Sequence, residues 1–449
     1  MATTSASPPD ATAALERTFV ADLPKRIGER VLVNGWLSGQ RRAKTVRFLN
    51  VRDRSGTVQC VYRDGEANGD VSDLMLESAV SVIGMVKEGG GRYGAVEVEI
   101  EHFELLARAE TPLPLDGNAD PEARLDHRHL DLRPRDRFIV FEVQTTLEAA
   151  MRDFVTDRGF IELHSPKLTA GGSESGATVF EVPYFGETAV LVQSPQFYMQ
   201  MGMAAGFDRV FEIGPVFRNE PGVTNRHATE FTIAHFEMSW IESHQDLITL
   251  HEDLLRYALS VVEDVHGRDV ERYCGIEVEV PREPIPRISL ADAAELTGEA
   301  VEGAGGRVLH RVEQALSKYA QQQYGHSFVF LTNYLASDRP FYTMREEAES
   351  QEPAESRSFD LLWRGLEITS GAQREHRHDR LRAQIAESGL ESDQVSRYLD
   401  PYYLDMFRYG CPPHGGFGFG VNRLVMSLLA QPSMRETSFV FRGPGRFVP

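Results

Sequence analysis

The sequence has few cysteines and no long apolar run. Its 449 residues include three cysteines, Cys60, Cys274 and Cys411, far apart in the chain. This odd number and wide spacing argue against a disulfide framework and a cysteine zinc site. No apolar run approaches the ~18–20 residues that span a bilayer. The first residues, MATTSASPPDATAA, lack the basic start and apolar stretch of a secretory signal. These absences predict a cytoplasmic protein with no membrane partner.

Basic residues are fewer than acidic residues. The chain has 47 Lys+Arg against 67 Asp+Glu, a formal net charge of −20. This balance argues against nucleic-acid binding through global electrostatics, but it leaves room for a local basic patch. The hydrophobic share of 41% and the charged share of 25% are ordinary for a globular protein. The length predicts two or three domains.

Four regions follow one another along the chain. Residues 1–15, rich in Ala, Thr, Ser and Pro, predict a disordered tail. Residues 16–108 hold five short alternating runs (VLVNGWL, VRFLNVRD, GTVQCVYRD, SVIGMVKE and AVEVEIEHFEL), which predict a small antiparallel barrel or sandwich. Residues 109–137 carry prolines, glycines and many charges, as a hinge does. Residues 138–449 alternate helical and strand patterns and predict a mixed α+β domain.

Basic residues gather in one strand pair of the predicted barrel. Between Arg41 and Arg54 lie six basic residues, one acid and the aromatic Phe48. Basic side chains neutralise phosphates, and an exposed aromatic ring offers an unstacked base a platform worth ~1–3 kcal/mol. The pattern suggests an oligonucleotide-binding fold. The alternative is a solvated strand pair with Phe48 in the core.

The segment FEIGPVFRNEPGVTNRHATEFTIAHFEMSW reads as strand, loop and strand. Arg218, Arg226 and His227 bracket the loop, and Glu220 and Glu230 lie close by. Guanidinium groups bind phosphate oxygens in a bidentate way, so this loop suits a polyphosphate. The alternative is a surface hairpin with ion pairs.

Two further clusters complete the chemistry. In PPHGGFGFGVNRL, the glycines allow close backbone approach to a ligand and Arg423 opens an apolar helix. In SFDLLWRGLEITSGAQREHR, Asp360 and Glu367 are hard oxygen ligands suited to magnesium bound with a nucleotide, and Arg374 could hold a carboxylate. No nucleophilic Ser or Cys arrangement accompanies them. The clusters favour attack of a bound carboxylate on the α-phosphate of ATP, which needs positioning and charge neutralisation.

These blocks resemble a known family. FRNE…RHATEF resembles motif 2 of the class II aminoacyl-tRNA synthetases, and GFGFGVNRL resembles motif 3. The helix from Phe138, followed by GFIELHSPKL with Pro166, resembles motif 1. The order of barrel, hinge and catalytic domain is that of the aspartate/asparagine/lysine subgroup. GLEITSGAQREHR, QSPQFYMQ and RPFYTM narrow the likeness to aspartyl and asparaginyl enzymes of archaeal type, a form also found in bacteria. It runs from about Thr18 to Pro449.

The resemblance implies a fold and an assembly. The α+β fold would combine an OB-fold anticodon-binding barrel over residues 16–108 with a class II catalytic domain over residues 138–449. The catalytic domain would hold an antiparallel six-stranded sheet flanked by helices. The motif 1 helix implies a homodimer.

The resemblance also implies a role for each matching residue. The implied ATP-binding positions are Arg218 at the α-phosphate, Glu220 near the adenine, Arg226 and His227 at the γ-phosphate, and Phe231 stacked on the adenine opposite Arg423. Of these, Arg218, Glu220 and Arg423 are the implied catalytic residues. Glu367 is also an ATP-binding position, and magnesium would be held by Glu367 and Ser370. Among the amino-acid-binding positions, Glu174 would bind the α-amino group. The side chain and its surroundings would be contacted by Gln196, Met199, His235, Ser370 and Arg374. The anticodon-binding positions are Phe48 and Gln59 at the middle base, a uridine in both tRNAs, and Ser38 near the first base.

Two positions depart from both specificity patterns. The aspartyl pattern QSPQLYKQ has a lysine where this chain has Met199, and the aspartate that pairs with it is His235 here. Asparaginyl enzymes have an apolar residue and a glutamate at these places. Losing a lysine from a desolvated carboxylate site costs ~2–5 kcal/mol unless something replaces it. A protonated His235 could replace it, a neutral His235 could bond an amide instead, or Arg374 could suffice alone.

Two more departures lie near the C-terminus. Asn422 stands where motif 3 usually has Glu or Asp, which predicts a weaker magnesium or water contact. VFRGPGRFVP replaces the usual FPRD, and no mechanism is evident for that change.

The function implied is an ATP- and Mg²⁺-dependent aspartate–tRNA ligase. It would form aspartyl-adenylate and transfer aspartate to the 3′-hydroxyl of tRNA(Asp), with tRNA(Asn) open as a second substrate. Asparagine or an aspartate analogue as the amino acid remains an alternative. A tRNA-independent amide-forming ligase is another, although such relatives commonly lack the barrel. A non-catalytic tRNA-binding relative would lose ATP-binding residues, and this chain retains them.

Overall fold

The structure is a computed structural model that describes residues 15–89, 93–115, 117–170, 178–220, 222, 224–298, 308, 310–346, 354–390 and 395–448. The chain divides into two compact units, residues 1–138 and 139–449. Of the predicted tail, residues 1–14 lie outside the described residues. No helix among the described residues is long and apolar enough to cross a membrane.

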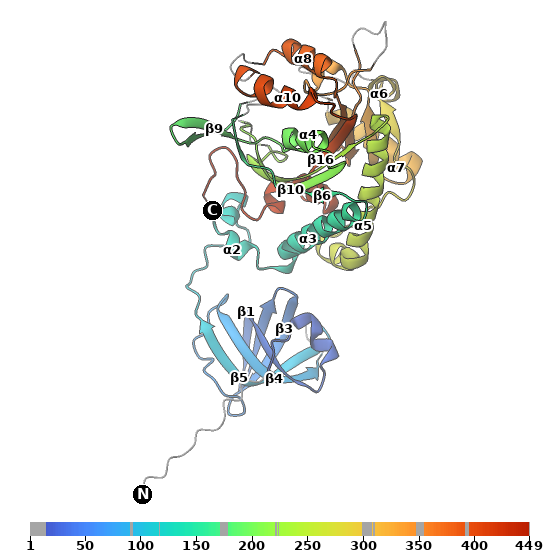
Figure 1. Cartoon of the computed structure of the whole chain (residues 1–449). Helices are drawn as coiled ribbons and strands as arrows, with labels where there is room; N and C mark the ends of the chain where they lie inside the picture. The colour runs from blue at the N-terminus through green and yellow to red at the C-terminus, as the bar shows by residue number, and fades with distance from the viewer. Residues whose placement is uncertain are drawn as a thin grey trace. The chain divides into compact units, whose positions relative to one another are not determined.

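The N-terminal unit is a closed five-stranded barrel with the order β1-β2-β3-β5-β4, as expected from the five alternating runs (Figure 1). Its elements are η1 (Val20–Lys25), β1 (Arg30–Ala43), β2 (Val46–Asp53), β3 (Gly56–Arg63), β4 (Ala79–Glu88) and β5 (Val96–Ala107). Leu49 and Val51 of β2 enter the barrel core. Because side chains alternate along a strand, Phe48 and Asn50 lie on the outer surface, which excludes a core position for Phe48.

The stretch predicted as a hinge contains two short helices, α1 (Pro121–Asp126) and α2 (Arg128–Asp131). Asp120 caps α1 through its side chain, which accepts a hydrogen bond from the Ala123 amide. Arg124 and Arg128 both bind Asp131. The charges of this stretch therefore hold two helical turns together.

The second unit is built on an eight-stranded sheet with the order β12-β13-β14-β15-β16-β11-β10-β6 in the described part of the chain. The strands are β6 (Ile161–Glu162), β10 (Arg209–Phe217), β11 (Glu230–Ser239), β12 (Arg287–Ser289), β13 (Phe328–Thr332), β14 (Ser358–Trp363), β15 (Leu366–Arg374) and β16 (His414–Gly420). The six central strands are antiparallel, as expected. Beyond the six antiparallel strands that were expected, β6 and β12 add a parallel strand at each edge.

Helices flank the large sheet, and a small three-stranded sheet lies beside it (Figure 1). The small sheet has β7 (Leu168–Thr169), β8 (Glu181–Tyr184) and β9 (Glu187–Leu191). The helices are α3 (Arg135–Thr156), α4 (Gln196–Ala204), α5 (His244–Cys274), α6 (Leu290–Thr297), α7 (His310–Tyr324), α8 (His378–Glu387), α10 (Leu404–Phe407), α11 (Val421–Leu428) and α12 (Met434–Thr437), with η2 (Ala336–Asp338) and η3 (Val395–Tyr403).

Strand alternation separates the two faces of the large sheet. Phe236 of β11, Phe417 of β16 and Phe359 of β14 join α3 and α5 in the main hydrophobic core. Their neighbours in sequence point to the opposite face. That face therefore receives the polar residues of the same strands, including His235 and Asp360, and it is the face on which a ligand can be bound.

Candidate functional site

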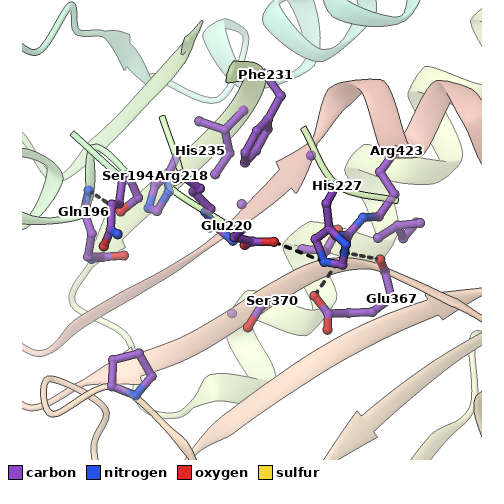
Figure 2. Close-up of a pocket in the computed structure, with 18 of the residues that line it drawn as sticks. Ser194, Gln196, Arg218, Glu220, His227, Phe231, His235, Glu367, Ser370 and Arg423 are labelled. Atoms are coloured by element: carbon purple, nitrogen blue, oxygen red, sulfur yellow. Dashed lines mark hydrogen bonds and ion pairs between the residues drawn. The ribbon is translucent and has the colours of Figure 1, made fainter. Parts of the chain in front are cut away.

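A cavity of about 870 Å³ opens over the polar face of the large sheet. Its walls come from the β10–β11 hairpin, strands β15 and β16, the start of α11 and the segment before β14. Figure 2 shows Gln196 and His235 toward one end, and Glu367, His227 and Arg423 toward the other. Predicted nucleotide and amino-acid residues thus share one cavity.

The β10–β11 hairpin supplies one wall. The Arg218 amide donates to the Thr229 carbonyl at 2.9 Å, which closes the base of the loop. The Arg218 guanidinium lies 5.4 Å from the centre of the Phe231 ring. His227 Nε2 lies 3.3 Å from Glu220 Oε2. Four residues of this hairpin that were predicted to bind the nucleotide line the cavity, namely Arg218, Glu220, His227 and Phe231.

Arg226 lines the same cavity and is held from α7. Its Nη2 lies 2.8 Å from His310 Nδ1, and its Nη1 lies 3.7 Å from Glu313 Oε2. A guanidinium held at the cavity wall is a positioned donor for an anion. The sequence reasoning did not single out His310 or Glu313, which lie more than eighty positions away along the chain.

Acidic and hydroxyl oxygens lie at the end of the cavity that contains His227 and Arg423. Asp360 and Ser370 are register partners on β14 and β15. Glu367 lines the cavity, where Arg423 Nη1 donates to its carbonyl at 2.9 Å and lies 3.6 Å from Oε1. Burial and the nearby Asp360 raise the pKa of Glu367. Asp360 is bound by Arg339.

This donor set fits a magnesium ion that arrives with a nucleotide. Mg²⁺ prefers oxygen ligands and usually takes one or two carboxylates together with phosphate oxygens. Glu367, Ser370 and Asp360 supply two carboxylates and a hydroxyl. The described residues contain no group of three or more His, Cys, Asp or Glu that could hold a metal by themselves.

A buried polar network forms the other end. Glu237 is fully buried and accepts from Arg374 Nε at 3.1 Å and from Gln196 Nε2 at 3.3 Å. His235 Nε2 lies 3.3 Å from the same carboxylate. His235 Nδ1 has no hydrogen-bond partner among the described residues, and His235 lines the cavity. Glu237 was missed in the sequence, although an acid inside the apolar strand TIAHFEM is a signal.

Met199 does not line the cavity. It is fully buried and packs with Met203, Val210 and Leu163 beneath α4. The polar residues that line this end of the cavity therefore include Gln196, His235 and Arg374, with Glu237 buried behind them. Predicted residue Glu174 lies outside the described residues, as does Pro221 of the hairpin loop.

The glycines of β16 make room for protein side chains. A Cβ added at Gly416 would lie 2.1 Å from Glu237 Oε2, and one at Gly418 would lie 3.2 Å from His235 Nδ1. Close approach of a backbone is a common reason for glycine in a strand. Here the approaching groups are the network of β11.

Asn422 does not line the cavity. Its Oδ1 accepts from the Thr232 amide at 3.2 Å, and its Nδ2 donates to the Thr437 carbonyl at 2.9 Å. The Arg442 carbonyl accepts from the Thr229 amide at 3.0 Å. Asn422 and the C-terminal segment thus tie β11 and the hairpin base to α12 and the residues beyond it.

In the barrel, the predicted anticodon residues lie on three adjacent strands, β1, β2 and β3. Ser38 donates to the Asn50 carbonyl at 3.2 Å, and Gln59 is the register partner of Asn50. The Arg41 guanidinium lies 4.6 Å from the centre of the Phe48 ring. The barrel surface therefore combines an aromatic ring, a cation and amide groups.

Comparison with known proteins identifies both units. The family described as tRNA synthetases class II (D, K and N) matches residues 120–441. The family described as OB-fold nucleic acid binding domain matches residues 31–106. An aspartate–tRNA(Asp/Asn) ligase from Aeropyrum pernix is 39% identical over 97% of this chain and 100% of its own length. An aspartate–tRNA(Asp) ligase from Thermococcus kodakarensis is 37% identical over 94% of this chain and 97% of its own.

Solved structures agree in fold. Asparaginyl-tRNA synthetase from Pyrococcus horikoshii, complexed with asparaginyl-adenylate, superposes with a TM-score of 0.85 at 29% identity, over 97% of this chain and 100% of that one. Aspartyl tRNA synthetase from Entamoeba histolytica gives a TM-score of 0.86 at 27% identity, over 100% and 96%. With its OB-fold barrel and its antiparallel catalytic sheet, the chain belongs to the class II tRNA synthetases of the D, K and N group.

Proposed function

We propose that this protein is an ATP-dependent aspartate–tRNA ligase. The observation that carries the proposal is the single cavity, which has Arg226 and Arg423 at one end and a buried arginine, Arg374, at the other. Such a cavity suits a nucleotide and an amino acid with an anionic side chain held end to end. The Aeropyrum pernix relative, whose name includes both the Asp and the Asn tRNA, supports the same amino acid.

In the proposed first step, an oxygen of the aspartate α-carboxylate attacks the α-phosphorus of ATP. Pyrophosphate leaves and aspartyl-adenylate forms. Arg218 binds the α-phosphate and Arg423 the adenine side of the nucleotide, while Arg226 and His227 hold the γ-phosphate. Glu367 and Ser370 would hold a Mg²⁺ ion, which would neutralise part of the phosphate charge. These residues act by positioning and electrostatic stabilisation.

In the proposed second step, the 3′-hydroxyl of the tRNA attacks the aspartyl carbonyl carbon and AMP leaves. Ser38, Phe48 and Gln59 on the barrel bind the anticodon of tRNA(Asp), with tRNA(Asn) as a second candidate. A homodimer formed through α3 and a cytoplasmic location complete the proposal. Retention of the barrel favours tRNA as the acceptor over a small amine.

One observation favours asparagine as a second candidate substrate. Glu237 compensates the charge of Arg374, so this end of the cavity gains a net positive charge only when His235 is protonated. A neutral imidazole can hydrogen-bond an amide through Nδ1. Protonation of His235 would therefore favour aspartate, and its neutral form would favour asparagine.

ATP–pyrophosphate exchange with aspartate and with asparagine, from about pH 6 to about pH 8.5, tests the proposal. We expect exchange with aspartate to exceed exchange with asparagine across this range, because Arg374 presents a guanidinium group to an anionic side chain. Arg423→Ala should abolish exchange, whereas Arg282→Ala, which removes a surface arginine, should not. Exchange with asparagine alone would reject aspartate. Charging of purified tRNA(Asp) and tRNA(Asn) then measures the acceptor range.

A further inference from the structure

Arg339 binds two of the oxygen donors suited to magnesium. Its Nη1 lies 3.0 Å from Asp360 Oδ1, and its Nη2 lies 2.8 Å from Asp360 Oδ2. Nη1 also donates to Ser370 Oγ at 3.1 Å. The guanidinium therefore makes a bidentate pair with the carboxylate and adds the neighbouring hydroxyl.

The surroundings hold this arginine firmly. Its guanidinium lies 3.6 Å from the centre of the Tyr334 ring, and only 12% of its side chain is exposed. Asp360 is 5% exposed. Charges at such depth interact more strongly than charges in water, so removing either partner leaves a costly unpaired charge. Arg339 nevertheless lines the cavity, which gives it a direction in which to move.

Arg339 and a metal ion compete for the same atoms. Mg²⁺ binds carboxylate oxygens at ~2.1 Å with little tolerance in geometry. A guanidinium that binds both oxygens of Asp360 and the Ser370 hydroxyl takes up one acceptor site on each atom and places a positive charge where the metal would bind. Arg423 likewise lies beside Glu367. Each of the two carboxylates already has a cation of the protein beside it.

We propose that Arg339 is an internal counter-cation that holds Asp360 and Ser370 in the nucleotide-free protein and gives them up when magnesium enters with ATP. The inference rests on the proposed ATP-dependent function. It makes metal binding depend on the nucleotide, because phosphate oxygens must add to the attraction before the metal can displace the arginine. Arg339 is therefore a positioning residue that suppresses binding of the metal alone.

The test measures Mn²⁺ binding to the full-length protein in the absence of nucleotide. Electron paramagnetic resonance detects the free ion, so its signal gives the fraction of Mn²⁺ that is bound. Arg339→Met should bind Mn²⁺ at least about tenfold more tightly than the wild type, because two carboxylates then lack one of their cations. The matched control is Arg345→Met, which removes an arginine paired with Glu387 at the surface. It should bind Mn²⁺ as the wild type does. Adding Asp360→Asn to Arg339→Met should abolish the gain.

Thermal unfolding gives a second readout. Millimolar Mg²⁺ without ATP should raise the Tm of Arg339→Met and leave the Tm of the wild type unchanged. If Arg339→Met does not fold, Arg339→Lys serves instead, because it keeps the charge but loses the bidentate fork. A gain in Mn²⁺ affinity for the lysine variant supports the proposal.

Equal Mn²⁺ affinity in the wild type and the folded variant would overturn the proposal. So would tight binding of Mn²⁺ to the wild type without nucleotide. Exchange activity of the wild type is measured separately. Its absence would reject the proposed ligase function, while the contrast in Mn²⁺ affinity would still decide whether Arg339 competes with a metal.

Discussion

At the scale of single residues, Glu237 organises the end of the cavity that contains His235 and Arg374. Its carboxylate binds Arg374, Gln196 and His235 and is fully buried. Burial alone raises the pKa of this carboxyl group, but Arg374 and His235 outweigh burial and lower the pKa to about 2. The carboxylate is therefore ionised near neutral pH, and it holds Arg374 in position before a substrate arrives.

We expect Glu237→Gln to lower the free energy of unfolding by about 3 kcal/mol near neutral pH, because Arg374 keeps its charge and loses its partner. The folded pKa of Glu237 lies below its unfolded value. Its contribution is therefore present above about pH 4.5 and is lost as the pH falls toward about 2. Urea unfolding across this range should show the wild type and the variant converging in acid.

The control for that experiment is Glu66→Gln, because the Glu66 side chain is 74% exposed. Exposed ion pairs contribute little, so its unfolding curve should follow the wild type at every pH. A stability gap for Glu237→Gln that does not narrow in acid would contradict the assigned role of the carboxylate.

Residue types could be predicted from the sequence, but their partners could not. Arg374, His235 and Glu367 stand in motifs, and all three line the cavity. Asp360 was expected to be a magnesium ligand, yet in the structure it binds Arg339, twenty-one positions earlier in the chain. A contact of this kind depends on how β14 lies beside the preceding segment. The local sequence around Asp360 does not determine this arrangement.

At the scale of secondary-structure elements, α5 buries a histidine against the large sheet. His251 is fully buried among Phe330, Phe359, Phe417 and Phe419. Neither of its ring nitrogens has a hydrogen-bond partner within the described part of the chain. Burial lowers its pKa to about 3. The helix therefore packs on the sheet with this imidazole neutral.

Acid should loosen this packing. The folded pKa of His251 lies below the unfolded value of about 6.5, so stability is full above about pH 6.5 and falls as the pH drops toward about 3. The shift corresponds to about 5 kcal/mol over that window. We expect His251→Leu to be as stable as the wild type near neutral pH or slightly more stable, because it buries no unpaired nitrogen.

Chemical unfolding of His251→Leu between about pH 7 and about pH 4 measures this effect. Its stability should depend less steeply on pH than that of the wild type. His378→Leu, in which a partly exposed histidine of α8 is replaced, is the control and should keep the wild-type slope. An unchanged slope for His251→Leu would mean that other groups cause the acid sensitivity.

The C-terminal elements support the β10–β11 hairpin. Asn422 accepts from β11 and donates to the last residue of α12, Thr437, so it needs both halves of its amide. We expect Asn422→Asp, the commoner type of residue in motif 3, to destabilise the protein by about 1–3 kcal/mol, because a carboxylate oxygen would face the Thr437 carbonyl. Thermal unfolding checks the change, with Asn50→Asp on the barrel surface as the control.

The same reasoning explains which elements the sequence revealed. Strands β1 to β5 run for eight or more residues and carry apolar residues at many alternate positions, so a period of two can be recognised in the sequence. Edge strands β6 and β12 have two and three residues, too few to display any period. Their pairing is decided by the strands they join. The expected six antiparallel strands came from the family resemblance and not from strand periodicity.

At the scale of the whole molecule, the charge is −20 while the barrel carries exposed cations. Arg41, Arg42 and Lys44 are exposed at the hairpin that joins β1 to β2, beside Phe48. An acidic protein repels a polyanion at long range, so productive contact with tRNA depends on such a local patch.

This contrast predicts a salt effect. Replacing Arg41, Arg42 and Lys44 together by alanine should weaken tRNA binding strongly at low salt and reduce the slope of log K against log salt by about 2–3, because each lost phosphate contact contributes about 0.7–0.9. The exchange reaction without tRNA should be unchanged, since these residues belong to the barrel unit. Filter binding over a series of salt concentrations measures the slope.

The matched control replaces Lys25, Arg26 and Arg30, three cations of the same barrel that pair with Asp22, Glu29 and Glu101. Both triple variants change the net charge equally, so they differ only in where the charge is removed. A smaller slope in the first variant alone would assign tRNA contact to the β1–β2 hairpin. Equal slopes in both would mean that net charge governs the encounter, and the proposed contact surface would be wrong.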